Sequence, residues 1–521
     1  MLSKVYSGSV LGIQGYIVEV EVDVSGGLPD FTIVGLPDAA IRESRERVRA
    51  AIRNAGWGFP ARRITVNLAP AIIRKAGTGF DLALAIGILG ATGLISGPVA
   101  GFLVVGELAL DGTVKPATGV LCIALAAREA GWKKIIVPRA NWQEAAAVDG
   151  LDVYPVKSLR EAFDVIRGGR AGHIIRDGMS CKAPSCGGFP GLESPDTGET
   201  PADISDVKGQ VHAKRALEIA AAGWHSVLLS GPPGSGKTML ANRLATLLPP
   251  MTKEESIEVT AIYSAAGLLA DGHGLVEHRP FRSPHHTSSI QGMVGGGRLL
   301  RPGEITLAHR GVLFLDELPE FRRDVLEALR QPLESGRVIL SRAIGAVVFP
   351  ARVLLICARN PCPCGFLGDA RRECRCSPRA IAAYDGRVSG PFLDRIDLHA
   401  EVPGQYNGEM TQDMASETSG KVFKRIMVAR AVQAERFCGE GISFNGEMSP
   451  SQVKKYCHMT DGAKSLITRA LNSLGLSARA GARILKVSRT IADLAGRDVI
   501  AEEHVAEAIS YRNPQRQIYP P

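Results

Sequence analysis

Short apolar runs alternate with amphipathic stretches along the chain, which predicts a protein built from both strands and helices. Residues 16–24 alternate strictly between apolar and polar side chains, as a half-buried strand does. Farther along, short uninterrupted apolar runs predict fully buried strands, and they lie at 227–229, 311–315 and 353–358. Apolar residues recur with a helical period at 239–248, and Pro249-Pro250 ends that predicted helix.

This pattern divides the chain into regions of different character. Strands and helices are mixed at the start, which predicts an α+β domain at 1–166. Glycine, proline, serine and charged residues without apolar periodicity then predict a linker at 167–203. The buried strands belong to a core at 204–403, which is followed by a connecting region at 404–445 and an all-helical lid at 446–521. We therefore predict an α/β protein with a parallel-sheet core.

The composition argues against a membrane protein and is compatible with binding to nucleic acid. At 521 residues the chain is too long for one hydrophobic core. No run of about 18 apolar residues is free of charge, so no membrane span is expected. The first residues lack the apolar core of a signal peptide, so the cytoplasm is the expected location. A net charge of +8 suits a polyanionic partner, although a basic surface without a partner explains it equally well.

One glycine-rich segment between a predicted strand and a predicted helix matches the phosphate-binding pattern G-x-x-x-x-G-K-[ST]. Its residues are Gly231, Pro232, Pro233, Gly234, Ser235, Gly236, Lys237 and Thr238. Glycines let successive backbone N–H groups curl around phosphate oxygens, and the helix N-terminus adds a favourable dipole. We expect Lys237 to reach the β- and γ-phosphates of ATP and Thr238 to hold Mg²⁺. A glycine-rich turn with a chance lysine is the alternative.

Two carboxylates supply the acidic partner that a phosphate-binding loop needs. Asp316 and Glu317 directly follow the apolar run at 311–315. We expect Asp316 to order the Mg²⁺ shell, and Glu317 to orient and polarise the attacking water. An Asp-Glu pair that merely caps a buried strand is the alternative.

Four cysteines lie close together, in the arrangement C-x-C, nine residues, C-x-C. They are Cys362, Cys364, Cys374 and Cys376. The chain has ten cysteines, but a cytosolic location does not favour a disulfide framework. Four thiolates within fifteen residues instead match a structural Zn²⁺ site. Free thiols or a redox switch are the alternatives.

Part of the N-terminal region resembles the proteolytic domain of Lon proteases. Two segments carry this resemblance, GELALDGTVKP at 106–116 and AGWKKIIVP at 130–138. The resemblance implies the fold of that domain. Lon enzymes use a Ser-Lys dyad, but the aligned positions fall near Phe80 and Leu121, whose side chains are neither nucleophile nor base. We therefore expect a Lon-like domain without peptidase activity.

The order of motifs along nearly the whole chain resembles the bacterial YifB/ComM family, the magnesium-chelatase-like AAA+ proteins. After the Lon-like domain and the linker come DVKGQ at 206–210, the phosphate loop, PHHT at 284–287, PGEITLAH at 302–309, LDELPEF at 315–321, NPCPCG at 360–365 and GPFLDRIDLH at 390–399. Arg359 and Ser488 depart from the family pattern, and neither departure removes a catalytic group.

The resemblance implies two further residues for ATP hydrolysis. Asn360, at the end of its strand, would contact the γ-phosphate or the attacking water. Arg395 would act as an arginine finger on the nucleotide of a neighbouring subunit, which makes a ring part of the mechanism. A surface pair of Arg395 with Asp394 or Asp397 is the alternative.

Resemblance to AAA+ ATPases also gives roles to the lid and to a predicted hairpin, whereas the role of a histidine-containing insert is inferred from its own residues. Arg479 would be the lid arginine that reads the nucleotide of its own chain, with Arg483 as the alternative. A two-stranded hairpin is predicted at 336–349, where Arg337 and Arg342 would contact DNA phosphates in a central channel. An edge ribbon without a ligand is the alternative. The segment with the adjacent histidines at 285–286 is expected to form a pore-facing loop.

The family implies a hexameric, ATP-driven DNA helicase. It would promote branch migration on single-stranded or branched DNA when incoming DNA recombines during natural transformation. The residues by themselves indicate only a Mg²⁺-dependent, ring-forming nucleoside triphosphatase with a basic surface. Two alternatives remain: a chelatase-type motor that remodels a protein partner, and a Lon-like protease or unfoldase, of which the missing dyad disfavours the protease.

Overall fold

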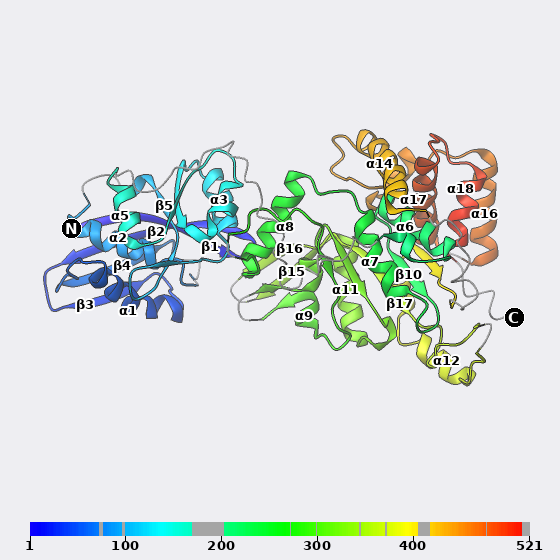
Figure 1. Cartoon of the computed structure of the whole chain (residues 1–521), viewed down its shortest axis with the longest axis horizontal. Coiled ribbons are helices and arrows are strands. Elements are labelled where there is room, and N and C mark those ends of the chain that lie inside the picture. Colours follow the sequence, from blue (N-terminus) through cyan, green and yellow to red (C-terminus); the bar gives the residue numbers. More distant parts are fainter. Residues whose placement is uncertain are drawn as a thin grey trace.

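The computed structural model describes residues 1–71, 75, 77–95, 99–168, 203–270, 272–297, 300–342, 345–369, 372–404, 417–475 and 477–512. The predicted linker at 167–203 therefore lies almost wholly outside the described residues. Figure 1 shows an elongated molecule, with the N-terminal domain at one end, the parallel-sheet core next to it and the C-terminal helices at the other end. Among the described residues, no helix combines the length and apolar character that crossing a bilayer requires.

The N-terminal domain is built on a seven-stranded sheet with the order β3-β4-β2-β1-β5-β8-β9. Its strands are β1 (Leu2–Leu11), β2 (Gln14–Ser25), β3 (Asp30–Val34), β4 (Arg63–Ala69), β5 (Leu103–Val104), β8 (Lys134–Pro138) and β9 (Asp152–Val156). β2 pairs antiparallel with β1 and β4, and the other neighbours are parallel. Buried valines alternate with partly exposed residues along β2, which confirms the alternating strand predicted at 16–24.

Helices cover both faces of this sheet. One face packs against α1 (Ala39–Asn54), α2 (Asp81–Ala91) and α5 (Leu159–Ile166), and the other against α3 (Val120–Glu129) and α4 (Trp142–Ala146). A small ribbon of β6 (Glu107–Leu108) and β7 (Val114–Lys115) carries the first Lon-like segment. Phe80 and Leu121, where the resemblance places the Lon dyad, are both buried.

The core contains a five-stranded parallel sheet with the order β11-β14-β17-β10-β18. The strands are β10 (Val227–Ser230), β11 (Phe281–Arg282), β14 (Val312–Leu315), β17 (Leu354–Arg359) and β18 (Leu398–Glu401). The main helices around it are α6 (Val211–Gly223), α7 (Lys237–Leu247), α8 (Lys253–Ala266), α11 (Arg323–Ser335) and α12 (Pro378–Asp385). The three apolar runs predicted as buried strands are β10, β14 and β17, so that prediction is confirmed. Nearly every residue of these strands is buried because helices lie on both faces.

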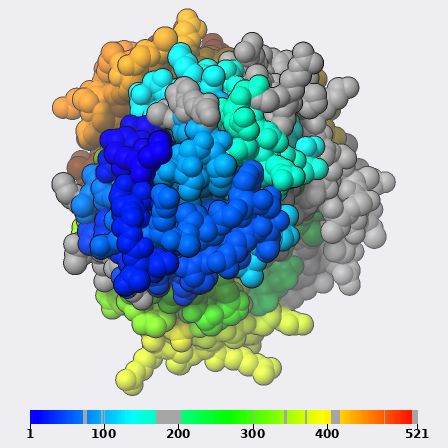
Figure 2. Space-filling model, turned by 90° about the vertical axis from the view of Figure 1, so that its left-hand side faces the viewer, coloured from blue at the N-terminus to red at the C-terminus, as the bar shows by residue number. Residues whose placement is uncertain are grey.

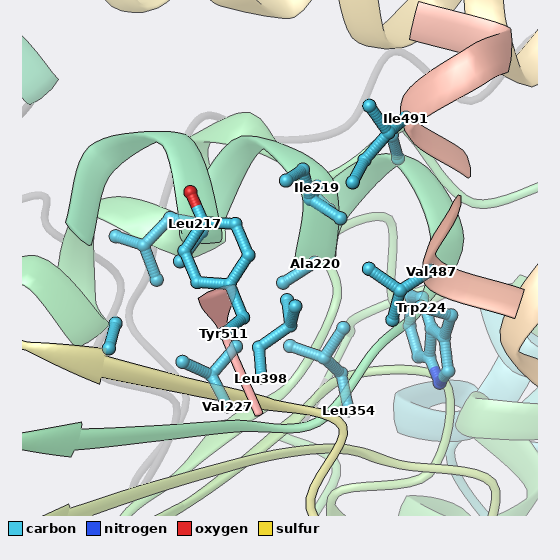
Figure 3. Packing of buried hydrophobic residues seen from close by; sticks show 14 of the residues in the cluster. Leu217, Ile219, Ala220, Trp224, Val227, Leu354, Leu398, Val487, Ile491 and Tyr511 are labelled. Carbon is cyan, nitrogen blue, oxygen red and sulfur yellow. The ribbon is translucent and has the colours of Figure 1, made fainter. Parts of the chain in front are cut away.

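The C-terminal region is helical, as predicted, and shares a hydrophobic cluster with the core. Its helices are α14 (Ser419–Arg436), α15 (Pro450–Tyr456), α16 (Asp461–Leu474), α17 (Ala478–Leu494) and α18 (Glu502–Ser510). Val487 and Ile491 of α17 pack with Ile219 of α6 and with Leu398 of β18 (Figure 3). The lid is therefore held against the core sheet through α6.

The N-terminal domain contacts the core through α3 and α8. Glu144 is buried between them, and its carboxylate accepts hydrogen bonds from the Ser264 hydroxyl at 2.6 Å and from the Leu121 N–H at 3.2 Å. The β1–β2 turn reaches farther, and Gly12 lies against Val347 of a hairpin made by β15 (Arg337–Arg342) and β16 (Gly345–Pro350). Figure 2 looks onto the N-terminal domain and shows the yellow segment around α12 projecting below it.

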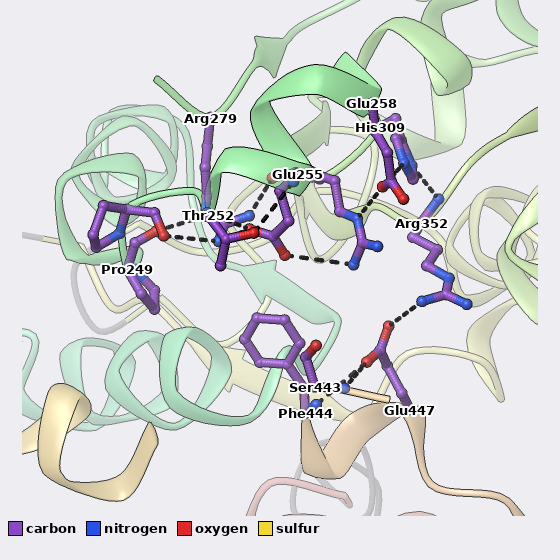
Figure 4. Close-up of polar contacts among 12 residues, drawn as sticks. Pro249, Thr252, Glu255, Glu258, Arg279, His309, Arg352, Ser443, Phe444 and Glu447 are labelled. Atoms are coloured by element: carbon purple, nitrogen blue, oxygen red, sulfur yellow. Dashed lines mark hydrogen bonds and ion pairs between the residues drawn. The ribbon is translucent and has the colours of Figure 1, made fainter. Parts of the chain in front are cut away.

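A polar network connects α8 to the core and to the C-terminal helices (Figure 4). Arg279 pairs with Glu255 of α8 at 2.7 Å. The His309 Nδ1 atom accepts a hydrogen bond from the Arg352 N–H at 3.0 Å, and the Arg352 guanidinium lies 3.8 Å from Glu447. The helix that receives the N-terminal domain is thus fixed relative to the lid.

Candidate nucleotide-binding site

The phosphate loop joins β10 to α7, as the sequence predicts. At Gly231 a Cβ atom would lie 2.1 Å from the carbonyl oxygen of Val402, so only glycine lets the loop pass this close to the chain that follows β18. Gly236 is the N-cap residue of α7 and offers no side-chain cap. The N–H groups of the first helical turn are therefore available to an anionic ligand.

Lys237 is the first residue of α7 and lies inside the loop. Its Nζ atom donates to the carbonyl oxygens of Gly231 and Pro232, both at 2.8 Å, and to Oδ1 of Asn360 at 3.2 Å. Burial lowers the pKa of Lys237, although Asp316 acts in the opposite direction. Within the described part of the chain no carboxylate pairs directly with this ammonium. The phosphates of a nucleotide would supply the missing negative charge.

Thr238 and Asp316 meet across the carboxyl edge of the sheet. The Thr238 hydroxyl donates to Oδ2 of Asp316 at 2.8 Å, although the two residues are 78 positions apart. They come together because the parallel strands β10 and β14 end at the same edge. A hydroxyl and a carboxylate are oxygen ligands of the kind that Mg²⁺ takes from proteins, so this pair fits the metal. When bound there, Mg²⁺ would neutralise charge on the β- and γ-phosphates.

Glu317 follows Asp316 and is exposed at the same edge. Its backbone has a φ angle of 51°, which is uncommon for a residue other than glycine. The Nδ1 atom of His286 lies 3.5 Å from its Oε2 atom. We expected His286 in a pore-facing loop, whereas the structure places it beside the predicted catalytic glutamate. The contact could have been anticipated, because the loop after β11 leaves the sheet at the edge where its parallel neighbour β14 ends.

Three arginines gather on one side of the core, around two carboxylates. Nη2 of Arg395 lies 2.7 Å from Glu334, and Nη2 of Arg479 lies 3.0 Å from the other oxygen of the same side chain. Arg483 pairs with Asp397. Burial acts to raise the pKa of Asp397, but Arg483 and His225 together outweigh it and hold the pKa well below its usual range. The partner of Arg395 is therefore Glu334, and neither of the two aspartates that the sequence suggested.

This cluster lies at the edge of the sheet opposite the phosphate loop. The Ser226 hydroxyl donates to the carbonyl oxygen of Arg395 at 3.0 Å, and Ser226 directly precedes β10. The phosphate loop follows β10, and four extended residues separate the two edges by about 13 Å. The placement suits an Arg395 that acts on a neighbouring subunit. It does not suit the prediction that Arg479 reads its own chain's nucleotide, because α17 begins beside Glu334.

β15 and β16 form the hairpin that the sequence predicts at 336–349. Arg337 is exposed at its base, opposite Pro350. The side chain of Arg342, the other predicted DNA contact, lies outside what the structure describes. One face of the hairpin, with Val338 and Phe349, is buried, while the other face is exposed. The exposed face is available to a ligand.

The four cysteines of the predicted metal site converge. Their sulfur atoms all lie within 4.8 Å of one another, and the distances from Cys362 to Cys364 and Cys374 are 3.4 and 3.7 Å. Four sulfurs around one tetrahedral Zn²⁺ would lie about 3.8 Å apart, so the donor set fits zinc. Backbone N–H groups of Phe366 and Arg375 donate to Cys364 and lower its pKa to about 6. They favour the thiolate form that binds a metal.

The fold and the site together define an AAA+ ATPase. A phosphate loop and an acidic pair lie at the carboxyl edge of one parallel sheet, and a helical lid follows. Family models described as magnesium chelatase subunit ChlI match in three parts, at residues 20–141, 203–410 and, for the C-terminal part of that subunit, 416–512.

Two full-length relatives narrow the class to a family. The "Competence protein ComM" of Haemophilus influenzae is 44% identical over 518 residues, which cover 98% of this chain and 97% of that protein. The "Uncharacterized protein YifB" of Escherichia coli is 41% identical over 522 residues, with the same coverage. The chain belongs to the ComM/YifB family of magnesium-chelatase-like proteins. Its N-terminal region is also similar to "Lon protease 2" of Bacillus subtilis, at 30% identity over 170 residues, covering 29% of this chain and 30% of that protein.

Proposed function

We propose that this chain is a ring-forming motor that couples ATP hydrolysis to movement on DNA. It would drive branch migration when incoming DNA recombines during natural transformation. The observation that carries the proposal is the position of Arg395 and Arg479 at the edge opposite the phosphate loop. Each nucleotide site then becomes complete only beside a second copy of the chain, and a closed ring, predicted to be a hexamer, provides that neighbour at every site.

Each residue of the nucleotide site has its own role in ATP hydrolysis. Lys237 binds the β- and γ-phosphates, while Thr238 and Asp316 hold Mg²⁺. Glu317 takes a proton from the attacking water, with His286 within reach of its carboxylate. Arg395 of one subunit leaves Glu334 and stabilises the charge that develops on the phosphates bound to the next.

Three observations support DNA as the partner. The chain carries a net charge of +8. The exposed face of the β15–β16 hairpin begins at Arg337, whose guanidinium suits a backbone phosphate, and Arg342 is expected to add a second contact. One relative at 44% identity is named a competence protein. Either single strands or branched junctions would offer phosphates to such a ribbon.

A motor that remodels a protein partner is the second candidate. It is favoured by the family models, all three of which are described as magnesium chelatase subunit ChlI. Such a motor would hydrolyse ATP without responding to DNA.

The two candidates are separated by ATP hydrolysis measured without DNA and with duplex, single-stranded or four-way-junction DNA. Lys237→Ala serves as the blank, because it removes the ammonium from the phosphate site. Strong stimulation by single strands or junctions, followed by branch migration of a labelled junction, is the expected result. Hydrolysis that is equally fast with every DNA and without any would contradict the DNA-motor proposal and favour the remodeller.

A further inference from the structure

The Cys₄ element, defined as residues 362–369 and 372–377, is continuous with the nucleotide site. Asn360, whose Oδ1 atom accepts a hydrogen bond from Lys237, lies only two positions before Cys362. Cys362 is fully buried. The chain thus passes from the central strand β17 to the predicted γ-phosphate contact and then directly to the first sulfur ligand.

The turn after the second ligand lies against the phosphate loop itself. Gly365 follows Cys364, and a Cβ atom placed on it would lie 2.5 Å from Cδ and 2.7 Å from Cγ of Pro233. The Gly365 N–H donates to the carbonyl oxygen of Cys362 at 3.0 Å, which closes the turn. Pro233 is in the middle of the phosphate loop, so the Cys₄ element forms one wall of it.

A further contact holds the far end of the element. α12 begins directly after the last ligands, where Ser377 is its N-cap residue. Asp385 at the end of α12 pairs with Arg359 of β17 at 3.4 Å, and Arg359 is buried. Both ends of the element are therefore tied to β17, the strand that Asn360 directly follows.

We propose that the Cys₄ element, with zinc bound, holds the phosphate loop in its nucleotide-binding shape, so that metal occupancy sets the affinity for ATP. The described residues of the element include few buried apolar side chains, so its folding free energy has to come from metal binding. Without the metal, no ion holds the four sulfur atoms together, and the Gly365 turn is free to leave Pro233. The inference rests on the proposed nucleotide site and is independent of DNA.

Two glycines of the element provide a matched pair of variants. Gly365 and Gly368 both have positive φ angles, 85° and 78°, so an alanine is strained to a similar extent at either position. Gly365 faces Pro233, whereas an alanine at Gly368 would meet no atom within 4 Å. We expect Gly365→Ala to weaken binding of a fluorescent ATP analogue about tenfold or more while zinc content, measured by mass spectrometry, stays unchanged. Gly368→Ala should match the wild type in both. Equal ATP affinity in the two variants overturns the proposal.

A third variant tests the metal separately. Cys374→Ser removes a ligand from the part of the element that lies farther along the chain than Gly365, and we expect it to lose zinc and to bind ATP as weakly as Gly365→Ala. Loss of zinc with unchanged ATP affinity also overturns the proposal, and this result decides the matter even if Gly365→Ala fails to fold. These binding experiments contain no DNA, so they test the Cys₄ inference independently of the DNA-motor proposal. A protein that binds ATP but does not respond to DNA would contradict the DNA motor, while the ATP affinities of the variants would still decide this inference.

Discussion

In the N-terminal domain and in the core, one helix begins with a buried charged residue, but the two charges have different kinds of partner. Asp81 opens α2, is 1% exposed, and its two oxygens accept hydrogen bonds from Arg47 at 2.7 and 3.1 Å. Lys237 opens α7 and donates to uncharged oxygens. Asp316 and Glu317 beside it remain accessible to solvent.

The difference separates charge that stabilises the fold from charge that is kept for a ligand. Burying a carboxylate without a cation costs several kcal/mol of folding free energy. Arg47 balances the charge of Asp81 within the chain. Among the described residues Lys237 has no such partner, and the phosphates of a ligand would supply one. Arg395 and Arg479 follow the second pattern, because both pair with Glu334, whose carboxylate is exposed to water, and such an ion pair is weak enough to exchange for a phosphate.

The largest effect is expected where a charge is kept for chemistry. Glu317→Gln keeps the shape of the side chain but removes the base, so the turnover rate for ATP should fall by about 10³-fold with nearly unchanged ATP affinity. Steady-state hydrolysis and a binding titration measure the two quantities. The control is Glu320→Gln, since Glu320 is exposed and pairs with Arg387 on the surface. A Glu317→Gln protein that keeps a tenth of the wild-type rate would remove Glu317 from the mechanism.

A comparable loss should come from the opposite edge of the sheet. Arg395→Ala is expected to lower hydrolysis by about 10²- to 10³-fold, because the finger then no longer stabilises the transition state. Mixing it with Glu317→Gln subunits, which bring an intact finger but no base, should restore part of the rate. Two inactive proteins that stay inactive after mixing would place the action of Arg395 within its own chain. Arg322→Ala, at an exposed surface pair, is the control.

The features that the sequence predicted are those that a short segment determines. The phosphate loop, the acidic pair and the Cys₄ cluster each occupy at most fifteen residues, and local backbone geometry brings their groups together. The hairpin and the strands β10, β14 and β17 also follow from local apolar runs. In such cases the local sequence pattern is enough to predict the structure.

The contacts that the sequence did not reveal join distant positions. Glu334 meets Arg395 across 61 residues and Arg479 across 145, and Glu144 meets Ser264 across 120. Such pairs depend on how helices pack, which no local pattern records. The role first assigned to Arg479 assumed a lid folded over its own phosphate loop, whereas packing of α17 against α6 puts this arginine at the other edge.

A smaller effect, on stability alone, is expected in the N-terminal domain. Arg47→Met leaves Asp81 buried without its cation and should lower the free energy of unfolding by about 3 to 5 kcal/mol at pH 7. Hydrolysis per folded molecule should stay within about twofold, because ATP binds elsewhere. Urea unfolding followed by tryptophan fluorescence reports this domain, which holds three of the four tryptophans, Trp57, Trp132 and Trp142. Arg42→Met, exposed on the same helix, is the control, and equal stability of the two variants would contradict the role of the pair.

The smallest predicted effect is on the pH dependence of stability, and it distinguishes the influence of burial on Asp81 from the influence of its pair with Arg47. Burial raises the pKa of Asp81 from 3.8 to about 6, although Arg47 acts to lower it. The folded protein therefore keeps a proton that the unfolded chain has lost, so this contribution to stability is complete below pH 4 and disappears as pH rises through about 6. At about 1.4 kcal/mol per pKa unit, the loss is about 1 to 3 kcal/mol.

Urea unfolding of the wild type and of Asp81→Asn between pH 4 and 7 tests this sign, because the amide cannot titrate. Burial also raises the pKa of Glu144, but Glu144 is present in both proteins, so the difference between their unfolding free energies isolates Asp81. We expect the wild type to lose stability relative to Asp81→Asn as the pH rises. If the difference is constant, Asp81 is ionised throughout this pH range. Its charge is then fully balanced by Arg47, in contrast to the charge of Lys237 in the core.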